Sequence, residues 1–243
     1  MTEFQGEQTF KTTQWSLILS SRESDQEIRR KSLSQLCESY WFPLFVYLRR
    51  KGHSPDDSAD YVQGFFSQLI EKEFLESASP DKGRFRWFLM SAIQRHVAKQ
   101  TAHQNAQKRG GGQRLISIDL ANAEERYQLE PVDGWTPEKL FERRWALEVL
   151  QQALKQLETE QTEKGKFELY QELQSTLSGV PINQQRYQEI ASQFSMSAGA
   201  VKVAALRLRE KYRKILQQIV AQTIDESDSI DDELEALLAA LRG

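Results

Sequence analysis

Apolar side chains recur at helical spacing in almost every stretch of this chain that lies between two breaks. The spacing predicts helices over residues 26–47, 55–74, 85–104, 137–160 and 167–177. No pair of neighbouring segments shows the alternation of apolar and polar side chains that marks two paired strands. The pattern therefore predicts an all-α fold: two small helical domains joined by a flexible linker, followed by an acidic C-terminal helix.

The breaks between these stretches set the expected boundaries. Pro43 is expected to bend or divide the first helix, because proline cannot donate a backbone hydrogen bond. Ser54 suits the N-cap of the second helix and Pro55 suits its first position. Residues 106–136 contain three consecutive glycines and little periodicity. The expected division is a first domain, a linker, a second domain and a C-terminal extension, at residues 10–105, 106–136, 137–220 and 221–243.

Residues 85–104 combine an apolar side with a polar side that carries cations. At 100° per residue, one side holds Phe85, Leu89, Ala92, Ile93 and His96. The other side holds Trp87, Ser91, Gln94 and Ala98, with Arg95 and Lys99 beside them. Packing on a neighbouring loop is the simplest explanation of Trp87, and a stacking surface for a base is the alternative.

Residues 187–215 read as a helix-turn-helix, in which the second helix of the pair enters the DNA major groove. A short amphipathic helix at 187–194 is followed by a turn at 195–197, where Ser197 is placed to cap the next helix. The inward stripe of that helix is Val201, Ala205, Leu208, Tyr212 and Ile215. A plain helical hairpin with a solvated basic face is the alternative interpretation.

The formal charge of −3 conceals a strong segregation of charge along the 243 residues. Residues 82–114 contain eight bases and no acid, and residues 186–214 carry an excess of five positive charges. Residues 225–243 have a net charge of −6. Two basic segments in an acidic protein suggest two surfaces that face phosphates, whereas solvated helix faces are the plainer explanation.

Several classes of protein are disfavoured by composition. The longest apolar run is too short to cross a membrane, and the N-terminus lacks the pattern of a secretory signal. One cysteine, Cys37, and three scattered histidines suggest no disulfide, no metal site and no cofactor. No nucleophile–base pair or carboxylate pair suggests an enzyme. The expected compartment is the cytoplasm.

Four motifs follow one another along the chain. They are YWFPLFVYLRRKG at 40–52, DSADYVQGFF at 57–66, GRFRWFL at 83–89, and YQEIA at 187–191 followed by SAGAVK at 197–202. In order and spacing the chain resembles the extracytoplasmic-function (ECF) sigma factors of bacterial RNA polymerase over roughly residues 33–216. Phe88 stands where this family usually has tryptophan. The segments KRGGG at 108–112 and FERRWA at 141–146 resemble the planctomycete-type branch.

The resemblance implies a promoter-specificity subunit with two DNA-binding domains. Sigma domain two would bind the polymerase clamp through Asp57, Asp60, Gln63 and Phe66. It would bind and open the −10 element through the 77–85 loop and through Arg84, Arg86, Trp87, Gln94, Arg95 and Lys99. Sigma domain four would read the −35 element with Ser197, Ala198, Gly199, Lys202, Arg207, Arg209 and Arg213. Implied partners are core RNA polymerase and promoter DNA, with an anti-sigma protein as an open option.

Three segments are less certain within this scheme. The acidic linker would pass through the polymerase channels that RNA normally occupies. Residues 160–183 depart from the usual entry to domain four, so the residues that meet the polymerase flap are left open. The acidic C-terminal helix has an apolar stripe, which predicts packing onto domain four. The alternative is an acidic flap that covers the basic recognition surface.

Two other functions stay open at this point. A helix-turn-helix regulator that binds DNA without polymerase explains residues 187–214, but it gives no role to the helices at 57–66 and 85–104. A helical scaffold with incidental basic faces would have no salt-dependent affinity for DNA.

Overall fold

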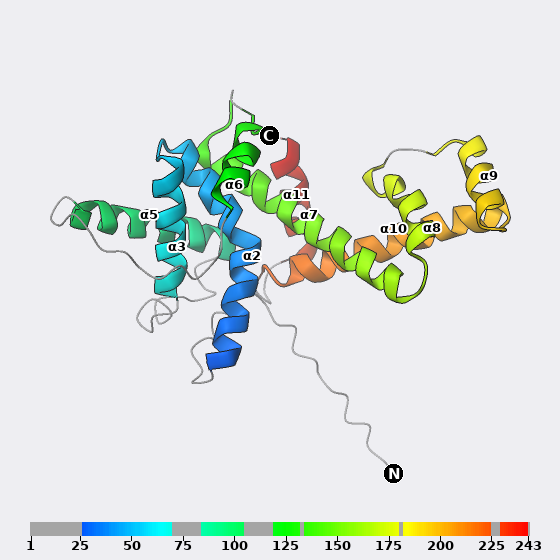
Figure 1. The fold of residues 1–243 in the computed structure, drawn as a ribbon, viewed down its shortest axis with the longest axis horizontal. Coiled ribbons are helices and arrows are strands. Elements are labelled where there is room, and N and C mark those ends of the chain that lie inside the picture. The colour runs from blue at the N-terminus through cyan, green and yellow to red at the C-terminus, as the bar shows by residue number, and fades with distance from the viewer. Residues whose placement is uncertain are drawn as a thin grey trace, which may run out of the picture. The chain divides into compact units, whose positions relative to one another are not determined.

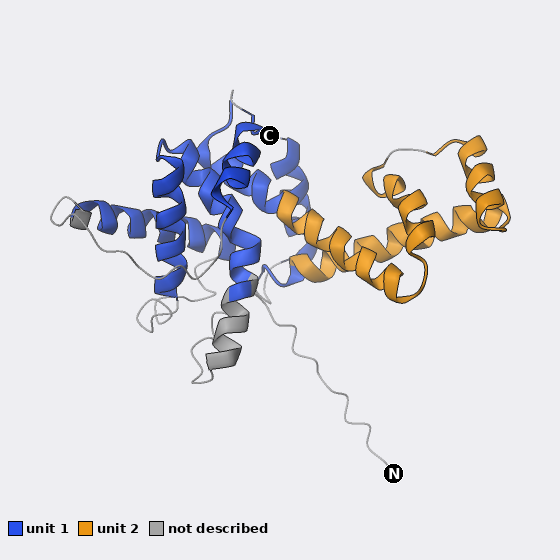
Figure 2. Cartoon of the chain, in the orientation of Figure 1, with its two compact units in different colours: residues 1–146, 221–243 blue, residues 147–220 orange. Residues whose placement is uncertain are grey.

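The computed structural model describes residues 26–69, 84–104, 119–131, 134–179, 182–224 and 229–242. All regular elements in these ranges are helical, so the predicted all-α fold class is confirmed (Figure 1). The chain forms two compact units, residues 1–146 with 221–243 and residues 147–220 (Figure 2). The predicted loop at 77–83 and the glycine-rich segment at 108–112 lie outside the described residues.

Unit 1 is built around three helices that cross one another. Helices α2 (Gln26–Arg50), α3 (Pro55–Leu69) and α5 (Phe85–Gln104) pack so that α3 contacts both of the others (Figure 1). The α5 bounds are those predicted from the sequence. The largest side chains of this core are aromatic, and Tyr40 meets Phe85 edge-on with ring centroids 5.5 Å apart. Such burial of apolar rings is the main stabilising contribution to a small helical domain.

Helix α2 continues past Pro43, although the sequence predicts a bend or a division there. The side chains on both sides of the proline explain the absence of a division. Phe42 and the five residues from Leu44 to Leu48 are all buried. Packing of this many apolar groups outweighs the cost of about 3 kcal/mol that proline brings inside a helix.

The expected flexible linker at 106–136 contains a helix, α6 (Leu120–Gln128), which its weak periodicity did not predict. The Asp119 side chain caps α6 by accepting from the Asn122 N–H at 3.1 Å. Glu124 then accepts two hydrogen bonds from Arg49 of α2, both at 2.8 Å. The Arg49 guanidinium also lies 5.0 Å from the centre of the Tyr127 ring. A helix of this length is marginal alone, so its contacts with α2 and α3 stabilise it.

Glu124→Gln is expected to lower the free energy of unfolding by about 0.5–1 kcal/mol near neutral pH, the usual size for a partly exposed ion pair. Hydrogen bonding from Arg49 lowers the pKa of the Glu124 carboxyl below its ordinary value of 4.5. The stabilisation is therefore complete above that value and is lost as the pH falls through the lower pKa of the folded state. Urea unfolding of both proteins between pH 3 and pH 7 measures the difference, which should shrink only in acid. A constant difference across this range would contradict the assignment.

Unit 2 contains the rest of α7 (Pro137–Glu163), whose first residues belong to unit 1. It continues with α8 (Phe167–Leu173), the 3₁₀ helix η2 (Gln174–Ser178), α9 (Gln184–Gln193) and α10 (Ala198–Ala221) as far as Val220. Asn183 caps α9 by accepting from the Arg186 N–H at 2.8 Å. Tyr170, Ile190, Val201 and Ala205 are among its buried residues.

The compact units and the functional domains predicted from the sequence are different divisions of the chain. The boundary between the units falls inside α7, between Ala146 and Leu147. In unit 1, Phe141 of α7 meets Tyr47 of α2 edge-on, at 6.3 Å between ring centroids. The functional boundaries at 105, 136 and 220 stay predictions.

Candidate nucleic-acid interface

Helix α5 has the two sides that its sequence predicts. Phe85, Leu89, Ala92, Ile93 and His96 are buried, whereas Trp87, Ser91, Gln94 and Ala98 are exposed. Arg95 and Lys99 are exposed beside them, one helical turn apart. Gln94 donates a hydrogen bond to the Tyr47 hydroxyl, which fixes its position on this face. The exposed side of α5 is thus a polar surface with two solvated cations and one large aromatic ring.

The two arginines at the start of α5 differ in burial, since Arg84 is partly exposed and Arg86 is buried. Arg86 is 3% exposed, and its guanidinium lies 4.3 Å from the centre of the buried Trp145 ring. The Arg84 side chain is 24% exposed and lies 5.1 Å from the centre of the Trp87 ring. Trp87 itself is 43% exposed and donates from Nε1 to Glu142 at 2.8 Å. Arg84 and Trp87 thus reach the surface, and Arg86 does not.

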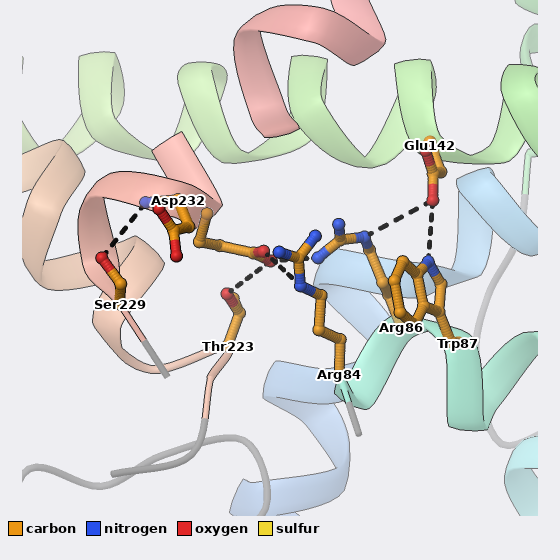
Figure 3. Close-up of polar contacts among 8 residues, drawn as sticks. Arg84, Arg86, Trp87, Glu142, Thr223, Ser229 and Asp232 are labelled. Carbon is orange, nitrogen blue, oxygen red and sulfur yellow. Dashed lines mark hydrogen bonds and ion pairs between the residues drawn. The ribbon is translucent and has the colours of Figure 1, made fainter. Parts of the chain in front are cut away.

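A carboxylate of α11 contacts both arginines, and Figure 3 labels the arginines together with Thr223 and Glu142. Glu233 of α11 (Ile230–Arg242) is fully buried and accepts from Arg86 through Oε1. Its Oε2 forms an ion pair with Arg84 Nε at 3.0 Å. Ser229 caps α11, where the Asp232 N–H donates to its hydroxyl at 3.3 Å (Figure 3). Helix α11 belongs to unit 1 and is ion-paired with the start of α5, a contact that the sequence did not predict, and its expected packing onto domain four stays a prediction.

The residues predicted to meet the polymerase clamp lie on α3 at two different depths. Asp57 and Asp60 are exposed, and Asp57 accepts from the Ser54 hydroxyl at 2.7 Å at the helix start. Gln63 is half-buried, with a buried Nε2 that lacks a hydrogen-bond partner among the described residues. Phe66 is 2% exposed and belongs to the core of unit 1. Asp57, Asp60 and Gln63 thus reach a common surface, while Phe66 supports it from inside.

A tight turn joins α9 to α10 in unit 2. Ser195 has φ of +52°, and the Met196 N–H donates to the Ala191 carbonyl at 2.8 Å. Ser197 caps α10 by accepting from the Ala200 N–H at 3.1 Å, which confirms the predicted cap. The buried residues of α10 include Val201, Ala205, Leu208 and Ile215 of the predicted inward stripe. Ala198 is half-buried and Gly199 is exposed, so the first turn of α10 is open to a ligand on one side.

The cations of α10 divide between two sides of the helix. Lys202, Arg209 and Arg213 are exposed and share one side by helical geometry. The Lys202 ammonium lies 5.5 Å from the centre of the Tyr187 ring of α9. Arg207 is exposed on another side, and Lys211 there pairs with Glu160 of α7 at 2.9 Å. Hydrogen bonding from Lys211 lowers the pKa of the Glu160 carboxyl.

The Arg207 side of α10 borders a groove within unit 2, with a volume of about 600 Å³. Its lining combines apolar side chains of α8, α10 and the turn before α10 with four cations. The lining residues are Gln161, Lys164, Lys166, Leu169, Tyr170, Leu173, Met196, Ala200, Val203, Ala204, Arg207, Leu208 and Lys211. Apolar side chains together with cations suit an amphipathic helix whose polar side is acidic.

Other chemistry is sparse in the part of the chain that the structure describes. That part contains no cluster of histidine, cysteine and carboxylate side chains able to hold a metal ion. Burial lowers the pKa of His96 to about 4, so this ring is neutral at physiological pH, and its Nδ1 lies 2.8 Å from Gln68 Oε1. Burial also raises the pKa of the Cys37 thiol to about 12, so it stays protonated. No described helix is both long enough and apolar enough to span a membrane.

The sequence predicted both cationic helix faces, but it did not predict the carboxylates that pair with the arginines at the start of α5. Glu142 and Glu233 stand in α7 and α11, far along the chain from Arg86. One signal was available for Glu233. It occupies the apolar stripe of α11, four positions before the fully buried Leu237. A carboxylate in such a stripe requires a cationic partner.

A protein-family model described as ECF sigma factor matches residues 45–218, which include α3, α5, α6, α7, α9 and most of α10. Searches of curated proteins and of solved structures each gave no match.

Proposed function

Because the chain belongs to the ECF sigma factor family, we propose that it directs core RNA polymerase to specific promoters by recognising their −35 and −10 elements and opening the −10 element. A sigma factor acts in transcription initiation by binding the polymerase and promoter DNA. The observation that carries the finer proposal is the presence of two exposed cationic helix faces, one on α5 and one on α10, in separate compact units.

We assign −35 recognition to α10, the second helix of the helix-turn-helix. Its first turn, with Ser197, Ala198 and Gly199, carries small side chains that allow close approach to base edges. Lys202, Arg209 and Arg213 would meet phosphates, which fix the position of the helix in the major groove. This division of labour predicts that the cations supply affinity and that the first turn supplies sequence preference.

We assign −10 binding to the exposed side of α5. Arg95 and Lys99 would hold phosphates of the opened strand, and Gln94 would meet base edges. Trp87 offers an exposed ring for stacking with a base, an interaction worth about 1–3 kcal/mol in single-strand binders. Capture of unstacked bases lowers the free energy of the opened duplex relative to the closed one, which is how binding drives melting.

We assign polymerase binding to α3 and, as a second contact, to the groove of unit 2. The cations that line that groove complement an acidic amphipathic helix, and we propose that a helix of the polymerase occupies it. With these assignments, residues 10–105 and 137–220 correspond to sigma domains two and four. A transcriptional regulator that binds DNA without polymerase would use neither polymerase-binding surface.

Asp60→Ala combined with Gln63→Ala is expected to reduce copurification of core RNA polymerase at least tenfold, because both side chains are on the exposed side of α3. Glu125→Ala with Glu235→Ala is the control, since it changes two exposed polar side chains of unit 1 that lie outside α3. Quantitative pull-down of polymerase with each tagged variant gives the comparison. Equal recovery with both variants would remove this side of α3 from the polymerase contact.

Run-off transcription tests the proposed function directly. Purified core polymerase is given a library of genomic promoter fragments, with and without the protein. Start sites that need the protein and that vanish with the α3 variant support a sigma factor. Absence of transcription together with a specific shift of a duplex fragment would instead indicate a regulator that is independent of polymerase.

A further inference from the structure

We propose that the Glu233 carboxylate occupies the site on Arg84 and Arg86 that a phosphate of promoter DNA would otherwise occupy. Helix α11 would therefore compete with the −10 strand for binding to α5. The proposal rests on the function proposed above, in which the start of α5 faces promoter DNA. It adds a regulatory role to the acidic C-terminal helix: the free protein keeps these arginines neutralised until α11 is displaced.

Arg84 and Arg86 together form an anion-binding site, and the Glu233 carboxylate of the same chain occupies it. Glu233 meets a separate arginine with each carboxylate oxygen, Arg86 through Oε1 and Arg84 through Oε2. The Thr223 hydroxyl lies 3.5 Å from the same Oε1. A phosphodiester offers two anionic oxygens with similar spacing, and arginine binds either anion through paired N–H donors.

One hydrogen-bond donor of this cluster has no acceptor in the part of the chain that the structure describes, which makes it easier for another anion to replace the Glu233 carboxylate. The buried Arg86 Nε has no hydrogen-bond acceptor among the described residues, because Glu142 Oε1 is 3.9 Å away. Removal of two charges from water offsets most of the attraction in a buried ion pair. The net stabilisation from the Glu233 ion pairs is therefore small, and an anion that approaches the arginines from solvent can replace the carboxylate.

Two residues of helix α11, Glu233 and Leu237, are buried. Leu237 is fully buried beside Glu233, whereas Leu238 of the same helix is 49% exposed. A helix of 13 residues depends on its packed face for its stability. Loss of the Glu233 contacts would therefore weaken the whole element.

The position of Arg84 shows which cation the departure of α11 would make available to DNA. Arg84 lies at the surface beside the exposed Trp87, and its guanidinium lies over that ring. Glu142 still holds the Trp87 indole N–H when α11 is absent, since this bond involves only α5 and α7. Departure of α11 would thus free the Arg84 guanidinium beside Trp87, and it would remove the carboxylate that neutralises Arg86.

The test compares Glu233→Gln with the matched control Glu235→Gln, which removes an exposed carboxylate from the same helix. The full-length proteins, bound to core polymerase, are titrated onto a labelled single-stranded oligonucleotide. Its sequence spans the −10 region of a fragment transcribed in the run-off assay. Binding is measured from 50 to 200 mM salt, and thermal melting of each protein is recorded in parallel.

Glu233→Gln is expected to tighten binding about tenfold, because a charge-assisted pair no longer has to be broken. It should also steepen the slope of log affinity against log salt by about 0.7 for each phosphate gained on a single strand. A purely structural role would not change this slope. Leu237→Ala, which loosens α11 without changing charge, should also tighten binding, and Arg84→Ala in the Glu233→Gln protein should reduce the gain.

Two results would overturn the proposal, and they can be told apart. If Glu233→Gln and Leu237→Ala lower the melting temperature but leave affinity and salt slope as in the original protein, α11 is only a structural part of unit 1. If the original protein and all variants fail to bind the strand, the −10 role of α5 fails, and competition fails with it.

Discussion

Replacement of Lys202, Arg209 and Arg213 by alanine is expected to weaken promoter binding by a factor on the order of 100 at 0.1 M salt. These three side chains are exposed on one side of α10 and carry no ion pair to another element among the contacts described. Each phosphate contact releases counterions, so loss of three should reduce the salt slope by about 2–3. The measurement is the affinity of the polymerase-bound protein for a duplex promoter fragment at several salt concentrations.

The matched control for this variant replaces Lys139, Lys155 and Arg242, which lie outside α10 and outside the groove of unit 2. These side chains are exposed, and their removal changes the net charge by the same amount. The control should leave the salt slope within about 0.5 of that of the original protein, because long-range charge is screened beyond about 10 Å at 0.1 M salt. Equal effects of the two triple variants would mean that α10 attracts DNA only through overall charge.

Trp145→Ala is expected to lower the free energy of unfolding of unit 1 by about 3–5 kcal/mol. Trp145 is 1% exposed, so its removal leaves a large cavity between α7 and its neighbours. It also removes the aromatic face on which the Arg86 guanidinium lies at 4.3 Å, which leaves a buried cation with one contact fewer. Urea denaturation followed by helical circular dichroism measures the change.

Trp87→Ala is the control for this stability prediction, since Trp87 is 43% exposed on the same helix that carries Arg86. It should cost about 1 kcal/mol or less, mainly through the lost bond to Glu142. The two tryptophans should also differ in function, because only Trp87 is available for stacking with a base. A larger loss of stability for Trp87→Ala than for Trp145→Ala would contradict the burial on which both expectations rest.

Several arginines of unit 1 form ion pairs with carboxylates from other parts of the chain. Arg143 and Arg144 of α7 both meet the buried Glu130 that follows α6, at 2.6 and 3.0 Å. Arg49 meets Glu124, and Arg86 meets Glu233. Many of the arginines therefore support packing, and the cations free to meet DNA are a smaller set than the composition suggests.

The sequence by itself determined the helical fold class, because periodicity of apolar side chains requires no knowledge of distant contacts. The bounds of α5, the cap at Ser197 and the two sides of α5 are local properties, and the structure confirms them. The family match supports the sigma factor assignment that the order of the motifs indicated. The roles assigned to individual side chains stay predictions.

Only the tertiary structure decided what depends on residues far apart in the chain. Helix α6 has a weak local signal, and contacts with Arg49 stabilise it. Arg86 belongs to a basic segment that was expected to face phosphates, yet it is buried because Trp145 and Glu233 reach it from two later helices. Periodicity predicts which face of a helix is buried, but the partner that covers that face is decided by the whole fold.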